Sequence, residues 1–142
     1  MKFDFTINGE AELTAALKSL EPKIAKRLMT KAMRPAAQII RHEIQARSPI
    51  KSGQLKRSFK IRAMPRSRKR FGIEIRSEEK DFKGTFITAF QEYGTSKMPA
   101  RPFMQPAFEA TKDQAHAKLV EGLKQLVDEA VNESAVKNQN AR

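Results

Sequence analysis

The sequence contains no cysteine, no tryptophan and only one tyrosine among its 142 residues. The absence of cysteine excludes disulfide bonds and thiolate metal ligands. The longest apolar runs fall far short of the ~18 residues that a membrane-spanning helix needs. The first residues, MKFDFTING, contain no apolar signal core. We therefore expect no membrane partner and a protein that is made and used in the cytoplasm.

Acidic residues are few compared with basic ones, 16 against 28, so the formal net charge is +12. The charge is local, because ten lysines and arginines and no acidic residue lie between Arg47 and Arg70. Such a block favours an anionic partner, either nucleic acid or an acidic protein surface. A solvated hairpin without a partner is the alternative that the sequence leaves open. The candidate electrostatic contacts are Lys56, Arg57, Lys60, Arg62, Arg66, Arg68, Lys69 and Arg70.

Patterns typical of enzyme active sites are nearly missing. The two histidines, His42 and His116, fall on expected helices without a metal-ligand partner four residues away. The stretch GTSK at residues 94–97 lacks the glycine spacing of a phosphate-binding loop, and no G-x-S-x-G nucleophile motif is present. We predict no catalytic activity, no cofactor, no metal and no small-molecule substrate.

The periodicity of apolar residues predicts an α+β fold. Residues 2–8 alternate as in a half-buried strand. Apolar residues three and four apart predict helices at about 10–20, 22–47 and 106–133. Pro35 should kink the second of these helices, which should end before the Ser48-Pro49 pair.

A β-hairpin is expected between the long helices. Phe59 and Ile61 alternate with basic residues, as do Ile73 and Ile75 further on, and a long basic loop at about 62–70 joins the two strands. Residues 82–93 are ambiguous. Their aromatic spacing suits one helical face, whereas residues 84–87 suit a strand, and we favour a short strand that leads into helical turns ended by Gly94.

The predicted architecture is a small antiparallel sheet, made of the N-terminal strand and the hairpin, packed against a long kinked helix and a long C-terminal helix. We expect a single domain over residues 1–133, with a mobile basic loop at about 62–70. A flexible C-terminal tail should occupy residues 134–142.

Two segments resemble signatures of a known family. SPIKSGQLKRSF, which follows an amphipathic helix, is similar to the "aPvdTGxLrxSi" segment of a tailed-phage neck family, and ITAFQEYGTSKMPARPFMQPAFE is similar to its companion, "YAxxvEfGTxxxpArPFlxPAxe". This is the gene-product-ten family of lambdoid coliphages, which comprises head–tail joining, tail-completion and minor tail proteins. The resemblance covers roughly residues 20–130. The matching residues are Pro49, Gly53, Leu55, Ser58, Glu92, Gly94, Thr95, Pro99, Arg101, Pro102, Phe103, Pro106 and Ala107.

The chain departs mildly from the family pattern. Ser52 stands where the family usually has threonine, Ile87-Thr88 where it has Tyr-Ala, and Tyr93 where it has phenylalanine. These differences affect the expected local packing more than the assignment.

The resemblance implies a structural virion protein of the head–tail interface without catalytic activity. Its members would act in tail completion, tail termination or head–tail joining, as a homo-oligomeric ring, a hexamer by tail symmetry. The implied partners are further copies of the chain, the tail-tube protein and an adjacent neck protein, with non-sequence-specific contact to passing DNA. The implied location is the head–tail junction of the virion, and the host cytoplasm during assembly. The alternative hypothesis is a nonspecific nucleic-acid-binding module that uses the basic 47–70 hairpin.

The proline-rich stretch between Glu92 and Glu109 is the most unusual part of the sequence. Its prolines fix φ and should hold a defined path at low entropic cost. Phe103 could then pack into the core of its own subunit or onto a neighbour. Arg101 could pair with Glu92 or with an adjacent subunit.

Overall fold

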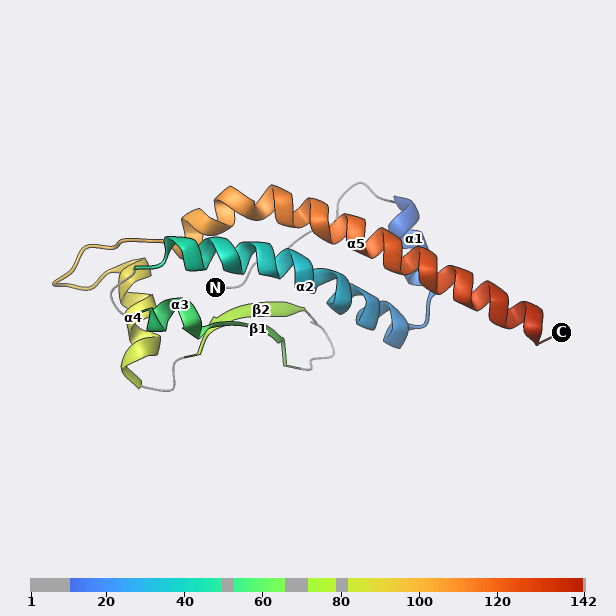
Figure 1. Cartoon of the computed structure of the whole chain (residues 1–142), viewed down its shortest axis with the longest axis horizontal. Helices are drawn as coiled ribbons and strands as arrows, with labels where there is room; N and C mark the ends of the chain where they lie inside the picture. Colours follow the sequence, from blue (N-terminus) through green and yellow to red (C-terminus); the bar gives the residue numbers. More distant parts are fainter. Residues whose placement is uncertain (1–10, 50–52, 66–71, 79–81, 142) are drawn as a thin grey trace.

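Two long helices, α2 (Pro22–Arg47) and α5 (Met104–Asn140), run side by side and form the most extensive contact between elements (Figure 1). The computed structural model describes residues 11–49, 53–65, 72–78 and 82–141. Helix α2 begins with proline at its first position, where the missing N–H costs nothing. It ends at Ser48, whose extended backbone is the conformation expected before a proline.

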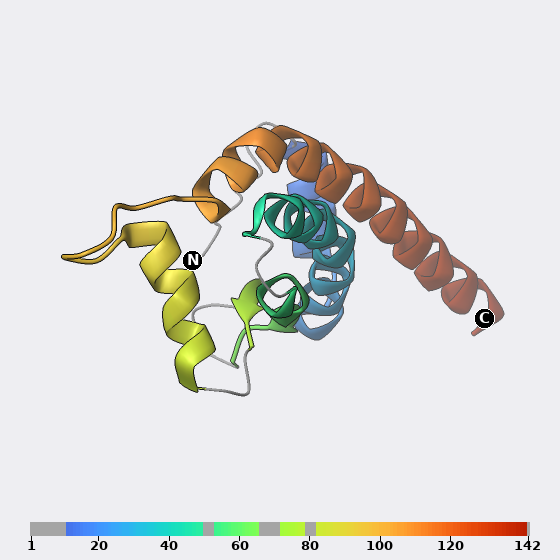
Figure 2. The ribbon, with the colours of Figure 1, turned by 60° about the vertical axis from the view of Figure 1, so that its left-hand side comes forward.

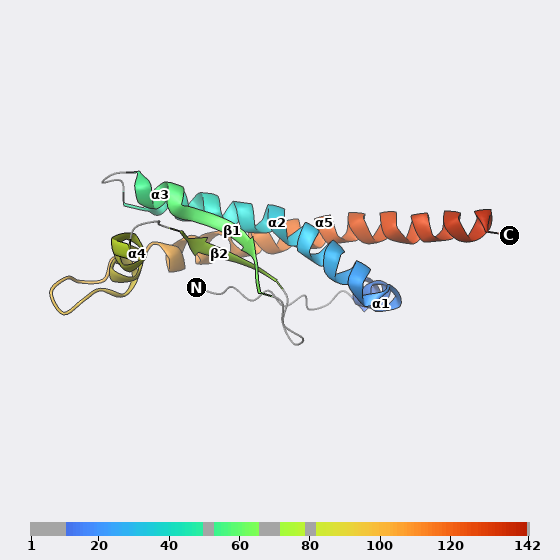
Figure 3. The ribbon, with the colours of Figure 1, turned by 90° about the horizontal axis from the view of Figure 1, so that it is seen from below.

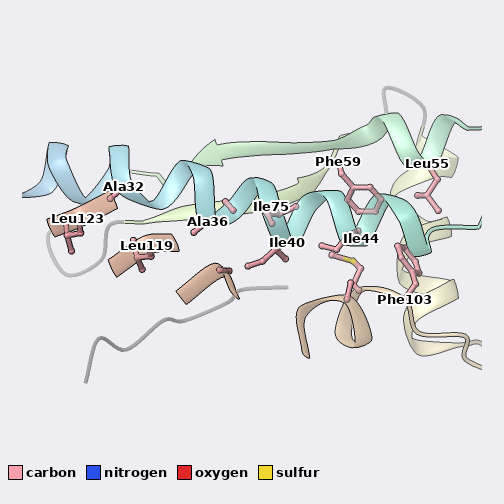
Figure 4. Packing of buried hydrophobic residues seen from close by; sticks show 14 of the residues in the cluster. Ala32, Ala36, Ile40, Ile44, Leu55, Phe59, Ile75, Phe103, Leu119 and Leu123 are labelled. Atoms are coloured by element: carbon pink, nitrogen blue, oxygen red, sulfur yellow. The ribbon is translucent and has the colours of Figure 1, made fainter. Parts of the chain in front are cut away.

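The seam between α2 and α5 is an apolar surface of mostly small and branched side chains. Alanines on α2 let α5 approach closely, and Leu119 and Leu123 of α5 lie against this face (Figure 4). The buried residues of the two helices are Ala32, Ala36, Ala37, Ile40 and Ile44 on α2, and Met104, Ala107, Thr111, Ala115, Leu119, Leu123 and Val127 on α5. Burial at every third or fourth position is what holds two amphipathic helices together.

A two-stranded antiparallel sheet covers the side of α2 that faces away from α5 (Figures 1 and 2). Strand β1 (Phe59–Ala63) follows the short helix α3 (Gln54–Ser58) and pairs with β2 (Ile73–Ser77), with Ile61 opposite Ile75. Phe59 and Ile75 are buried against α2. The predicted hairpin and the α+β class are thus confirmed, whereas the predicted strand at residues 2–8 lies outside the described residues.

Two shorter helices complete the fold. Helix α1 (Ala11–Ser19) contacts both α2 and α5, and α4 (Phe82–Tyr93) lies at the opposite end of the molecule, near α3 (Figure 3). The predicted strand at 84–87 is wrong, because these residues belong to α4. The helical alternative, suggested by the aromatic spacing, was the right one.

The ends of α5 differ from the prediction in both directions. The helix begins at Met104, two residues before Pro106, and it extends to Asn140 rather than to about Glu133. Beyond Val127 none of its residues is buried, and this part extends past α2 at one extremity of the molecule (Figure 1). No helix in the described part of the chain combines the length and apolar character needed to cross a bilayer.

Candidate functional site

The two segments that resemble family signatures, residues 48–59 and 87–109, meet in space. Phe59 ends the first segment, and its ring packs edge-on against that of Phe103 in the second, with centroids 6.0 Å apart and an interplanar angle of 72°. Both side chains are buried. Edge-to-face packing is a favourable geometry for aromatic pairs. Core burial of Phe103 within its own subunit is therefore confirmed.

Glu92 ties α4 to the beginning of α5. One carboxylate oxygen accepts hydrogen bonds from the backbone N–H groups of Phe103 and Met104 at 2.9 and 3.0 Å, and the other accepts one from Gln105 at 2.9 Å. The first N–H groups of a helix have no partner within the helix. A carboxylate there also interacts favourably with the helix dipole. Phe103, at the N-cap, supplies no side-chain cap, so Glu92 does so from another helix.

The loop between α4 and α5, residues 94–102, is held at both of its ends. Gly94 has φ +73°, and a Cβ there would lie 2.7 Å from the backbone nitrogen of Ala100, so glycine is required on both counts. Thr95 and Met98 exchange backbone hydrogen bonds, and the Thr95 hydroxyl accepts a third from the N–H of Met98. The N–H of Arg101 donates to the carbonyl of Gln91 at 2.7 Å. The loop therefore has a defined shape, and it projects from the molecule (Figures 1 and 3).

A set of three hydroxyl groups connects the first segment to the sheet and to α4. The Ser58 hydroxyl donates to the carbonyl of Leu55 at 2.7 Å and lies 2.9 Å from the hydroxyl of Ser77. The hydroxyl of Thr88 donates to the same Ser77 oxygen at 3.3 Å. Leu55, Ser58 and Thr88 are buried. Sequence reasoning missed Ser77 and Thr88; the strand register, which places Ser77 at the end of β2 opposite Phe59, is what brings them together.

The matched family residues divide into a buried, a partly buried and an exposed group. The buried ones are Leu55, Ser58, Glu92, Phe103 and Ala107, and the partly buried ones are Pro49, Gly53, Gly94 and Pro106. Gly53 also adopts positive φ, +68°, just before α3. The exposed ones are Thr95, Pro99, Arg101 and Pro102.

The predicted pairing of Arg101 with Glu92 is wrong. The carboxylate of Glu92 is buried and receives the three backbone N–H groups, whereas the Arg101 side chain is exposed and forms no ion pair with any residue that the structure describes. The other possibility, contact with a neighbouring subunit, stays a prediction.

The basic candidates lie on α3 and on the outer face of the sheet. Lys56, Arg57, Lys60 and Arg62 are all exposed. Arg62 forms a bidentate ion pair with Glu78, with one hydrogen bond of 2.8 Å, so an acidic side chain from beyond the basic block reduces its charge. Lys60 lies opposite Arg76 in the strand register, a like-charge pairing that is unfavourable unless an anion lies nearby. The remaining candidates, Arg66, Arg68, Lys69 and Arg70, lie outside the described residues.

The histidines lie on different helices, His42 exposed on α2 and His116 partly buried on α5. Within the described ranges, no three histidine or acidic side chains gather as metal ligands would. Glu92, Ser58 and Thr88 of the two segments instead bind backbone and hydroxyl groups of the same chain. This arrangement can fix the positions of α3, α4 and α5 and present the 94–102 loop and the basic face to other molecules.

Comparison with known proteins gives one family. The sequence model of the family described as "Bacteriophage HK97-gp10, putative tail-component" matches residues 11–94. This match covers more than half of the chain, including the whole first segment and the beginning of the second. No curated protein and no solved structure gives a significant match.

Proposed function

This chain belongs to the HK97-gp10-like family of phage tail components, and we propose that it acts at the head–tail interface as a ring of identical subunits. Family membership is the observation that carries the proposal. It makes the protein a structural component of the virion that contacts other tail or neck proteins. Families of this structural kind typically have no enzymatic activity. Within the interface, the proposed role is tail completion or termination, or head–tail joining, and the proposed ring is a hexamer that matches the symmetry of the tail.

The internal bonding of the two segments supports a role in assembly. Glu92 and the hydroxyl set satisfy their hydrogen bonds within the subunit, so they hold the exposed surfaces in place rather than bind a ligand. A loop already fixed before binding loses little conformational entropy when a partner docks. Closed rings form through heterologous contacts, in which each subunit uses two different faces.

The basic face is proposed to meet an acidic neighbour at the edge of the ring. Lys56, Arg57 and Lys60 are exposed and form no ion pair among the described residues. Their charges are available for the acidic surface of a tail-tube or neck protein, which would gain association rate and orientation from this complementarity. DNA passing through the ring is the other anion that this face could contact.

Electron microscopy of the purified chain mixed with assembled tail tubes tests the role directly. We expect rings, or tubes capped at one end, and tubes of defined length when the chain is present during assembly. Uncapped tubes together with a chain that stays monomeric at all concentrations would contradict the proposal.

A triple substitution, Lys56→Ser, Arg57→Ser and Lys60→Ser, separates the protein partner from DNA. With a protein partner, tube capping weakens and duplex DNA binding is absent or unchanged. With DNA as the partner, DNA affinity falls and its log–log salt dependence decreases by roughly 0.9 for each lost phosphate contact. The matched control replaces three exposed basic residues of α2, Lys23, Lys31 and Arg34, and should leave both activities intact.

A further inference from the structure

Two opposite extremities of the molecule carry exposed apolar side chains. Large hydrophobic side chains that are exposed in the described part of the chain are Ile24, Phe90, Tyr93, Val131 and Val136. Tyr93 is 73% exposed and Phe90 42%, and both lie at the end of α4 beside the 94–102 loop. Val131 and Val136, 45% and 55% exposed, lie on the C-terminal part of α5. The loop and the end of α5 lie at the two ends of the longest axis (Figures 1, 2 and 3).

The charges of these two extremities are opposite. Residues 93–102 contain Lys97 and Arg101 and no acidic residue, whereas residues 128–140 contain three acidic residues and one lysine. The net charges are therefore +2 for the first (two basic, no acidic) and −2 for the second (one basic, three acidic). Contact between two identical ends would place like charges together, but contact between unlike ends would pair them.

The C-terminal part of α5 is not covered by any element that the structure describes. From Asp128 onward no residue of the helix is buried. This part continues the packed part of α5, so it needs no nucleation of its own, but it gains none of the tertiary packing from which most helical stability in proteins comes. A second molecule lying along one face of this part would bury Val136 and stabilise it.

We propose that the end of α5, residues 128–140, of one copy docks on Tyr93 and the 94–102 loop of the next copy. This inference rests on the proposed ring and names the two faces that form it. Val136 shares one face of the helix with Glu129 and Glu133, at spacings of three, four and seven residues. Tyr93 and Phe90 supply apolar area against Val136, and Lys97 and Arg101 face Glu129 and Glu133. Because the two faces lie at opposite ends of each subunit, the contact is head-to-tail, the type that generates a ring when the rotation between subunits closes.

Cysteine cross-linking tests this contact cleanly, because the natural chain has no cysteine. Full-length chains carrying Tyr93→Cys and Val136→Cys are mixed, assembled into tails of the phage that encodes the protein, and oxidised. We expect heterotypic disulfides between the two variants, formed roughly tenfold or more faster than with a Glu121→Cys control. Glu121 is also exposed on α5 but lies before its unpacked end. A chain with both substitutions should give a ladder that ends at the ring size.

The outcomes separate this contact from the proposed function. Rings on the tails without heterotypic disulfides, or with disulfides between two Tyr93→Cys chains, overturn the contact and leave the ring intact. Cross-linking of Val136→Cys to a tail-tube or neck protein instead also overturns it. Absence of the wild-type chain from purified tails overturns the proposed function and the contact with it.

Charge reversal gives an independent measurement. Glu129→Lys with Glu133→Lys should lower the occupancy of the chain on tails by roughly tenfold, and so should Lys97→Glu with Arg101→Glu. Because all four side chains are exposed, circular dichroism should show unchanged folding in each variant. Combining the two sets in one chain restores opposite charges and should return the occupancy to within about threefold of the wild type. Failure of the combination to restore occupancy contradicts the pairing.

Discussion

The α2–α5 seam and the attachment of α4 are built in different ways. The seam buries a continuous row of apolar side chains along two long helices. In the part of α4 whose side chains the structure describes, residues 88–93, the buried residues are Thr88 and Glu92, and both are polar. The seam is stabilised by removal of apolar area from water, whereas α4 is oriented by directional hydrogen bonds. The comparison indicates that the seam stabilises the fold. The hydrogen bonds of Thr88 and Glu92, which we call the α4 joint, fix the position of α4.

The largest expected effect comes from the seam. Leu123→Ala should lower the free energy of unfolding by about 3 kcal/mol, because Leu123 is fully buried and its loss leaves a cavity. Urea unfolding followed by circular dichroism measures the change. Val131→Ala, on the exposed part of the same helix, is the control and should change stability by less than about 0.5 kcal/mol. Equal effects of the two substitutions would show that the seam does not hold the fold.

At the joint, Glu92→Gln should cost about 2 kcal/mol. The amide keeps one acceptor oxygen but places an NH₂ group against a buried backbone N–H, and it removes the charge that favours the helix N-terminus. The measurement is again chemical denaturation. Glu109→Gln, exposed on α5 and paired with Lys112 and Gln105 among the residues that the structure describes, should cost less than about 0.5 kcal/mol. A Glu92→Gln protein as stable as the wild type would show that the three hydrogen bonds do not stabilise the fold.

Gly94→Ala should cost about 1–2 kcal/mol from its positive φ alone, and the clash with Ala100 should also displace the loop. Gly53→Ala is the matched comparison, since Gly53 has a similar φ but the nearest atom to an added Cβ would lie 3.9 Å away. Both proteins should lose stability, but only Gly94→Ala should lose occupancy on tails. The reverse order of occupancy would argue against the loop as a contact surface.

The smallest effect is expected for the hydroxyl set. Thr88→Val keeps the shape of the side chain and removes its hydrogen bond to Ser77, so a loss of about 1 kcal/mol or less is expected. Thr30→Val, whose hydroxyl bonds only the carbonyl of Lys26 in its own helix, should change stability even less. Thermal unfolding of both variants in parallel would resolve the difference, and an equal or larger loss for Thr30→Val would rule out a role for the hydroxyl set.

The sequence predicts the α2–α5 seam well because the apolar residues that form it recur at every third or fourth position. The spacing of Ala115, Leu119 and Leu123 identifies the buried side of α5. Thr111 was overlooked because it is polar. It is nevertheless buried, and its hydroxyl donates a hydrogen bond to the carbonyl of Ala107 at 2.7 Å. The α2 boundaries follow from two prolines whose local effects are strong.

The α4 joint could not be predicted from the periodicity of apolar residues. Local preferences in residues 84–87 favoured a strand, and the tertiary contacts of Thr88 and Glu92, one helical turn apart, override them. The three donors to Glu92 lie 11 to 13 residues further along the chain, a separation that no periodic pattern reports. Resemblance to the family marked Glu92 as important, but only the structure shows that it acts as a helix cap.

The contacts that hold both ends of the 94–102 loop have an evolutionary consequence. Gly94 fixes where the loop leaves α4, and the bonds of Arg101 and Phe103 fix where it rejoins α5. Residues between these anchor points, such as Ser96, Lys97 and Pro99, are exposed and can change without disturbing the interior. Substitutions at a few exposed positions of the 94–102 loop could therefore change which neighbouring protein this subunit binds in a given phage, while the rest of the fold stays the same.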